Sequence, residues 1–202
     1  MRNRRAGQHT AGQDAGITLV EVVVSMSLMA VFMAMFTTTI LGIFRMVNRN
    51  DATSTAQSQV NIAFLRLDKE IRYAAGISVP GSVGTDPHVE YVTTNTGTPV
   101  CTQLRLHLAS QQLQRRTWTS GSTPVTPTAW IPLASNVGGA QPFTFSAAGD
   151  TFNFQRLRLT LIATAGGGST AASRQTEITF TALNTTLGTS SADICTEGRS
   201  IP

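Results

Sequence analysis

The chain has 202 residues, of which 41% are apolar and 13% are charged. Its net charge of +4 is too small, and its basic residues are too dispersed, to indicate a nucleic-acid-binding protein. Two cysteines exclude a scaffold dense in disulfides and a zinc site built from cysteine alone. All six methionines lie within the first 46 residues, so an apolar N-terminal part is joined to a more polar remainder.

Residues 1–16 form a short basic segment that precedes the apolar part of the chain. The segment carries Arg2, Arg4 and Arg5 and has no apolar core of its own. A secretory signal has its apolar region before the cleavage site, whereas here the apolar residues follow the small ones. Cleavage near Gly16 would therefore leave the hydrophobic helix in the mature protein.

Residues 17–44 are predicted to form one apolar helix. At about 1.5 Å per residue this helix would be roughly 42 Å long, enough to cross a bilayer core of about 30 Å. Arg45 and Arg49 end the apolar run, and the basic leader lies on its other side. The positive-inside rule places the leader in the cytoplasm and the C-terminal part outside. We therefore expect a single-pass protein of the inner or cytoplasmic membrane.

Glu21 is the single charged residue within residues 17–44. A carboxylate inside a membrane helix is costly, so it is expected to be paired or protonated. One interpretation places Glu21 at the membrane interface, in contact with lipid headgroups. The other interpretation gives it a positive partner, and the new α-amine of Ile17 in a neighbouring, axially staggered subunit is a good candidate.

The run from Gly16 to Glu21, GITLVE, resembles the class III signal of type IV pilins and pseudopilins. This resemblance covers about the first 45 residues. It implies that a prepilin peptidase cleaves between Gly16 and Ile17 and then methylates the Ile17 amine. It also implies that Glu21 neutralises this amine in an assembled filament. The chain departs from the commonest family pattern at Ile17, where phenylalanine is more frequent.

A second helical segment is predicted over residues 45–76. Gly76 and Pro80 are expected to end this helix. Residues 61–74 also resemble the matching helix of W-type minor pilins and J-type minor pseudopilins. A one-sided apolar stripe of the kind found here packs against a sheet. The stripe recurs at spacings of four, four, three and four residues and consists of Ala56, Val60, Phe64, Leu67 and Ile71.

Residues 77–202 are predicted to form a β-rich exported domain. No long helical run interrupts it, so an antiparallel meander is favoured over a doubly wound sheet. Three prolines make residues 121–132 an exposed loop, within which Trp130 is assigned to the core. With the resemblance, this predicts an α+β, pilin-like fold, in which a long N-terminal helix packs on an antiparallel sheet. Alternating apolar residues indicate strands around 104–108, 113–118, 143–145, 157–161 and 178–182.

Cys101 and Cys195 are the two cysteines of the chain. In an oxidising, exported setting such a pair usually forms a disulfide. The bond would close a loop of about 94 residues, with a model-dependent gain of roughly 4–5 kcal/mol. Two free thiols are the alternative. Neither cysteine has the spacing of a metal ligand.

The sequence indicates no catalytic, cofactor or metal site. His9, His88 and His107 are scattered, and no nucleophile–base pair is apparent. Asp193 and Glu197 are potential calcium ligands, but two carboxylates are a weak signal.

Four arginines on predicted strands are a further candidate, for binding DNA or another anionic partner. A solvated β-face is the favoured interpretation of this pattern. The four are Arg115, Arg116, Arg156 and Arg158.

The sequence therefore predicts a minor type IV pilin-like subunit with a structural or nucleating role and no enzymatic activity. Its expected partners are other pilins in a filament, a prepilin peptidase, a pilus or secretion assembly platform, and the membrane through residues 17–44. DNA is a further partner without support in the sequence. The final location is a cell-surface or periplasmic filament. Two alternatives stay open: a pseudopilin of type II secretion or DNA uptake, and a membrane-anchored extracytoplasmic binding protein that does not polymerise.

Overall fold

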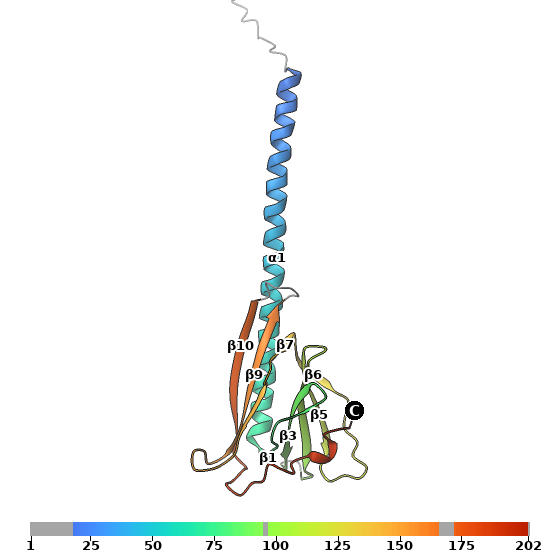
Figure 1. Cartoon of the computed structure of the whole chain (residues 1–202), viewed down its shortest axis with the longest axis vertical. Coiled ribbons are helices and arrows are strands. Elements are labelled where there is room, and N and C mark those ends of the chain that lie inside the picture. The colour runs from blue at the N-terminus through green and yellow to red at the C-terminus, as the bar shows by residue number, and fades with distance from the viewer. Residues whose placement is uncertain (1–17, 95–96, 166–171, 202) are drawn as a thin grey trace, which may run out of the picture. The chain divides into compact units, whose positions relative to one another are not determined.

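The computed structural model of the protein describes residues 18–94, 97–165 and 172–201. The predicted leader and its cleavage site lie outside these ranges. The chain divides into two compact units, Met1–Val47 and Asn48–Pro202, and each is described by itself. Helix α1 (Leu19–Arg72) contributes to both units (Figure 1).

In the first unit, almost every described side chain of α1 is exposed. Apart from Ile40, which is half-buried, the large apolar side chains on this part of the helix are exposed by between 40% at Val22 and 81% at Leu19. The stretch Leu19–Asn48 has a mean hydropathy of 2.2 and is long and apolar enough to cross a membrane. The apolar helix predicted over residues 17–44 is therefore present over its described part.

The second unit contains two antiparallel sheets. In the first sheet the strand order is β1-β3-β4-β5-β6, with β2 paired to β3; in the second, β10, β9 and β7 follow one another and β8 also pairs with β9. The strands are β1 (Ala74–Ile77), β2 (Gly81–Val83), β3 (Asp86–Thr93), β4 (Val100–His107), β5 (Gln112–Thr119), β6 (Ile131–Ser135), β7 (Val137–Gly138), β8 (Phe143–Ser146), β9 (Gln155–Ala165) and β10 (Ala172–Ala182). A short 3-10 helix, η1 (Thr196–Gly198), lies in the C-terminal tail.

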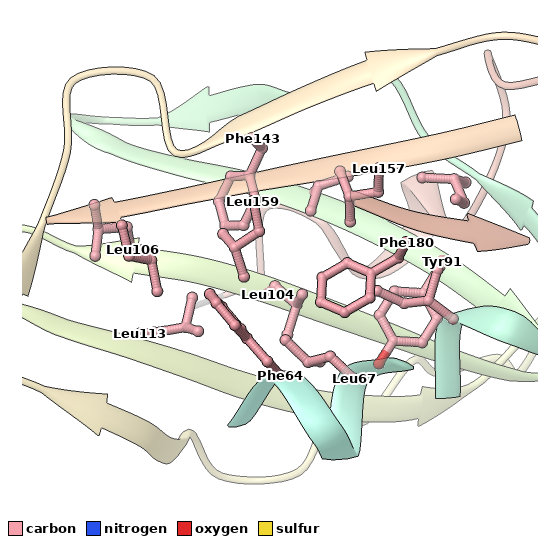
Figure 2. Close-up of a cluster of buried hydrophobic side chains, with 14 of the residues drawn as sticks. Phe64, Leu67, Tyr91, Leu104, Leu106, Leu113, Phe143, Leu157, Leu159 and Phe180 are labelled. Carbon is pink, nitrogen blue, oxygen red and sulfur yellow. The ribbon is translucent and has the colours of Figure 1, made fainter. Parts of the chain in front are cut away.

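The apolar stripe of α1 forms one wall of the hydrophobic core, as predicted. All five of its members are buried, and Leu67 and Ile71 are fully so. Phe64 meets Phe180 of β10 edge to face, with ring centroids 6.1 Å apart. Figure 2 shows Phe64 and Leu67 projecting from the helix among leucines of both sheets. The stripe thus packs against the two sheets together.

Glu70 connects α1 to the first sheet on the polar side of this contact. Its carboxylate accepts a hydrogen bond of 2.6 Å from the Tyr91 hydroxyl and lies 3.0 Å from Arg115 Nε and 3.1 Å from Arg66 Nε. Burial raises the pKa of Tyr91, so the hydroxyl stays protonated and remains the donor. Arg115 is therefore a structural partner of the helix and not part of a free basic surface.

The structure corrects the predicted end of the helix. Helix α1 ends at Arg72, and Gly76, expected to terminate it, lies in strand β1. A Cβ atom on Gly76 would lie 2.6 Å from Ile194 Cδ1 in the tail. The glycine therefore allows a close approach between β1 and the tail. From the local sequence, a glycine required for such an approach looks the same as a glycine that ends a helix.

The predicted loop over residues 121–132 is shorter in the structure. Pro132 lies in β6, at the edge of its sheet, where a missing backbone donor is tolerated. Trp130 is half-buried and lies outside both hydrophobic clusters, so its assignment to the core was wrong. Its ring instead contacts two guanidinium groups, 3.8 Å from Arg105 Cζ and 4.3 Å from Arg116 Cζ.

Candidate functional site

The first candidate site is the start of α1. Thr18 precedes the helix, and its Oγ1 accepts a hydrogen bond of 3.3 Å from the backbone N–H of Glu21. This contact satisfies one of the free N–H groups of the first turn. The Glu21 carboxylate also lies where the helix dipole favours negative charge. Glu21 therefore has a local role at the helix start in addition to the assembly role predicted for it.

The apolar surface that follows Glu21 has no covering within the described residues of its own unit. Its polar side chains turn inward to the helix backbone: the hydroxyl groups of Ser27 and Thr37 donate to the carbonyls of Val23 and Met33, at 2.8 and 2.7 Å. These bonds leave the helix surface apolar. An apolar surface of this extent needs lipid or other helices around it.

Gly16 and Ile17 lie outside the described residues, so the structure does not test the cleavage site. The pairing of Glu21 with the amine of Ile17 likewise stays a prediction. Glu21 itself is exposed, and no ion pair involves it among the described residues.

The second candidate site is the polar face of the first sheet, opposite the core. Strand register places two rows of polar residues side by side: His88, Arg105 and Gln114 form one row, and Glu90, Gln103 and Arg116 form the other. The second row is almost completely buried. The solvated β-face that the sequence favoured for Arg116 is therefore wrong, and Gln103 is buried beside it.

The C-terminal tail covers this second row. Arg199 Nη2 lies 2.8 Å from Glu90 Oε2, and Arg116 Nη2 donates to the Gly198 carbonyl at 3.0 Å. Gln103 joins the row internally, since its amide donates to Glu90 and its oxygen accepts from Arg116 Nε, at 2.9 and 2.8 Å. The tail thus supplies both a cation for Glu90 and a carbonyl for Arg116.

A disulfide holds the tail in this place. Cys101 and Cys195 are bonded, which is one of the two arrangements expected from the sequence. Trp118 packs against the bond, and its indole Nε1 donates to Glu197 at 3.3 Å. Gly198 lies against the same ring, where a Cβ atom would come within 2.5 Å of Trp118 Cε2. The tail therefore packs closely against the sheet at Cys195 and Gly198.

His88 is the unusual member of the first row. It is 2% exposed, and neither ring nitrogen has a hydrogen bond of good geometry to a described residue. Its Nε2 lies 3.3 Å from Glu90 Oε1. The two groups would form an ion pair if the ring were protonated. Burial lowers the pKa of His88; Glu90 and the backbone of Asp86 oppose this shift, while Arg199 and Arg116 reinforce it.

The stability of the second unit is expected to fall as the pH drops below about 6.5, the ordinary pKa of histidine. The folded chain resists the proton that the unfolded chain accepts at His88, so acid favours unfolding. Urea unfolding at about pH 7.5 and pH 5.5 measures this slope. A His88→Gln variant should show a shallower slope over the same interval, and equal slopes in the two proteins would contradict the prediction.

Other residues singled out from the sequence have structural roles. The Glu197 carboxylate accepts hydrogen bonds from Trp118 and from the Gly121 amide, so it is not free as a calcium ligand. His107 hydrogen-bonds to Ser110 in the turn after β4, at 2.6 Å. Arg158 pairs with Glu177 across β9 and β10, at 3.5 Å. Among the described residues, no three histidine, cysteine or acidic side chains gather in a group able to hold a metal.

Sequence reasoning missed the buried polar row, although one signal pointed to it. Cys101, Gln103 and Arg105 lie on the same face of β4, because their side chains alternate with Leu104 and Leu106. A bond from Cys101 to Cys195 must therefore bring the tail onto this face. Neighbours of Cys195 would then be expected to cover Gln103.

Comparison with protein families finds the prokaryotic N-terminal methylation motif over residues 12–37. This segment includes Gly16, Ile17 and Glu21. No curated protein and no solved structure matches the chain. The motif implies processing by a prepilin peptidase and assembly with other pilins, and together with the apolar helix it fits membrane anchoring. The methylation motif at the start of the apolar helix supports a type IV pilin-like or pseudopilin protein.

Proposed function

We propose that the chain is a minor pilin-like subunit whose role in a filament is structural or nucleating. The leader, residues 1–16, is removed after Gly16, and Ile17 becomes the methylated first residue. Residues 17–44 serve as membrane anchor and filament core, residues 45–76 belong to the packing segment, and residues 77–202 form the exported domain. The observation that carries this proposal is the methylation motif placed on a bare apolar helix.

The role of Glu21 follows from the charge it brings into this surface. No other charged residue occurs between Leu19 and Phe44. When neighbouring helices or lipid cover the surface, an unpaired carboxylate there becomes costly. A methylated amine at residue 17 of an adjacent subunit would neutralise it and fix the axial position of the two helices. Assembly then depends on the charge of Glu21.

A Glu21→Gln variant separates this charge from the local role of Glu21 at the helix start. Glutamine also serves at the third position of a capping box, so the Thr18 contact and the helix start are retained. The variant is expected to insert into the membrane at normal levels. The amount recovered in sheared filaments or pilin complexes is expected to fall by at least about tenfold. Membrane fractionation and quantitative immunoblotting of the sheared fraction measure the two quantities.

Ser27→Ala is the matched control. It removes a polar group from the same helix, but that hydroxyl bonds locally to the Val23 carbonyl. Its assembly should be normal. Normal recovery of Glu21→Gln would reject the filament role and favour a membrane-anchored binding protein that does not polymerise.

Processing is tested on the native chain by mass spectrometry of its mature N-terminus. The proposal expects a methylated Ile17. An N-terminus upstream of Gly16 would contradict the proposed processing.

The pseudopilin alternative remains within the same family of functions. A subunit of a secretion or DNA-uptake system would share the motif, the helix and the dependence on Glu21. The resemblance of residues 61–74 to W-type pilins and J-type pseudopilins belongs to the same distinction between a pilus and a secretion system. Pull-down of the intact chain followed by identification of its co-purifying assembly platform distinguishes the systems.

A further inference from the structure

A cavity of about 260 Å³ adjoins the buried polar row on the face of the first sheet. The β2–β3 hairpin, strands β4 and β5, the loop that carries Trp130 and the end of the C-terminal tail surround it. All of these segments belong to the second unit. The side chains that define its chemistry are His88, Arg105, Arg116, Trp130 and Arg199.

The charges around the cavity are mainly positive. Among the described residues, three guanidinium groups and one carboxylate, that of Asp86, line it. Glu90 lies beside Arg199 at 2.8 Å and neutralises it, while Asp86 Oδ1 accepts from the Leu108 amide. The other two guanidinium groups of the lining are those of Arg105 and Arg116, and Arg116 is hydrogen-bonded to Gln103 and to the Gly198 carbonyl.

The charge of Arg105 disfavours the charge of Arg116, whereas Asp86 favours the charge of Arg105. Both guanidinium groups lie on the Trp130 ring, Arg105 at 3.8 Å and Arg116 at 4.3 Å from its centroid. Burial lowers the pKa of Arg116, and the charge of Arg105 lowers it further. Within the described residues Arg105 has no ion pair, and its Nε donates to the neutral Gln114 at 2.9 Å. An anion beside Arg105 would relieve this repulsion.

His88 adds an unfilled hydrogen-bonding group to the same cavity. Arg105 is its directly opposite partner across β3 and β4. Glu90 Oε1 lies 3.3 Å from His88 Nε2 and the Asp86 backbone also interacts with the ring, but neither ring nitrogen has a hydrogen bond of good geometry among the described residues. A ring N–H can therefore donate to a ligand. Val83, Ile201 and the Trp130 ring supply apolar surface on the remaining sides.

We propose that this cavity binds a small organic carboxylate, with its carboxylate between Arg105 and His88 and its apolar body against Trp130, Val83 and Ile201. A guanidinium fork matches a carboxylate geometrically, and an imidazole N–H completes the contact. The carboxylate comes either from a free metabolite-sized molecule or from an acidic side chain of another protein. The proposal does not depend on filament assembly, because every residue it uses belongs to one chain.

The experiment titrates benzoate into the full chain in detergent micelles and follows the two tryptophan indole signals by ¹H–¹⁵N NMR. A Trp130→Phe variant assigns the signals, since Trp118 is the other tryptophan. Benzoate should shift the Trp130 signal saturably, whereas benzamide, its neutral counterpart, should not. Glutamate blocked at both backbone ends, as the N-acetyl and C-terminal amide derivative, keeps its side-chain carboxylate and is titrated in parallel. Tighter binding of benzoate assigns a free ligand, and tighter binding of the blocked glutamate assigns a protein side chain.

Arg105→Gln should weaken benzoate binding by about tenfold to a hundredfold, because a charge-assisted hydrogen bond is lost. Arg158→Gln is the matched control, since Arg158 lies on the second sheet and pairs with Glu177. Arg105→Lys tests the site if Arg105→Gln fails to fold, and it should give intermediate affinity.

The proposal is overturned if neither carboxylate shifts the Trp130 signal at about 10 mM, where a complex of millimolar Kd would be mostly formed. It is also overturned if benzamide binds as well as benzoate, or if Arg158→Gln weakens binding as much as Arg105→Gln.

Discussion

Replacing Cys101 and Cys195 by serine is expected to lower the free energy of unfolding by about 4–5 kcal/mol. The bond spans 94 residues, and a cross-link over so long a loop strongly restricts the unfolded chain. It also holds the tail that covers Glu90 and Arg116. Urea unfolding followed by tryptophan fluorescence measures the change, because Trp118, one of the two tryptophans, is 3% exposed and packs against the bond.

Reduction of the wild-type protein should reproduce the loss without any substitution. Reductant should leave the stability of the double serine variant unchanged, which makes that variant the control. A difference below about 1 kcal/mol between the oxidised and reduced wild-type protein would show that the tail is held by its other contacts.

The second large effect is expected at Glu90. Glu90→Ala should destabilise the folded chain by about 3–5 kcal/mol, the usual result of removing one member of a buried charge pair. Glu90 is fully buried and accepts hydrogen bonds from Ser78 at 2.7 Å, Gln103 at 2.9 Å and Arg199 at 2.8 Å. The substitution leaves these donors without their acceptor, although Arg199, with its side chain 30% exposed, keeps part of its hydration.

Glu90→Gln is the informative control, because it keeps the volume and one acceptor oxygen but removes the charge. It should cost clearly less than Glu90→Ala. Equal losses of unfolding free energy in the two variants would assign the effect to the charge alone. The hydrogen bonds to Glu90 would then contribute little to stability. Unfolding by urea at neutral pH gives both values.

The apolar half of the fold could be predicted from the sequence because periodicity reports directly which side chains are buried. The stripe from Ala56 to Ile71, the alternating leucines of β4 and β9 and Leu113 of β5 are all buried. Helix and strand periods differ, so these patterns identify element type as well as burial. The two-sheet arrangement was not evident, since alternation within a strand does not specify its neighbours in space.

The polar half could not be predicted in the same way. Gln103 and Arg116 are polar strand residues of the kind usually found at a surface. They are buried by the C-terminal tail, whose described regular structure is the short helix η1. Gly76 shows the same limit, because its need for a small residue comes from Ile194, far away in the sequence. Long-range coverage of this kind leaves no periodic signal. The helix-start motif was recognisable because its chemistry depends on neighbouring residues alone.

The position of Cys195 along the chain has a consequence for the order of folding. It follows all the strands of the described residues, and Arg199 comes later still. In a protein that crosses the membrane from its N-terminal anchor outward, the strands emerge before the residues that neutralise Glu90. With the proposed export, the first sheet would carry an uncovered charged face until translocation is finished and an oxidant has joined the cysteines. Completion of export and oxidation would thus act together as the last folding step, and a subunit arrested before it would expose that face to chaperones and proteases.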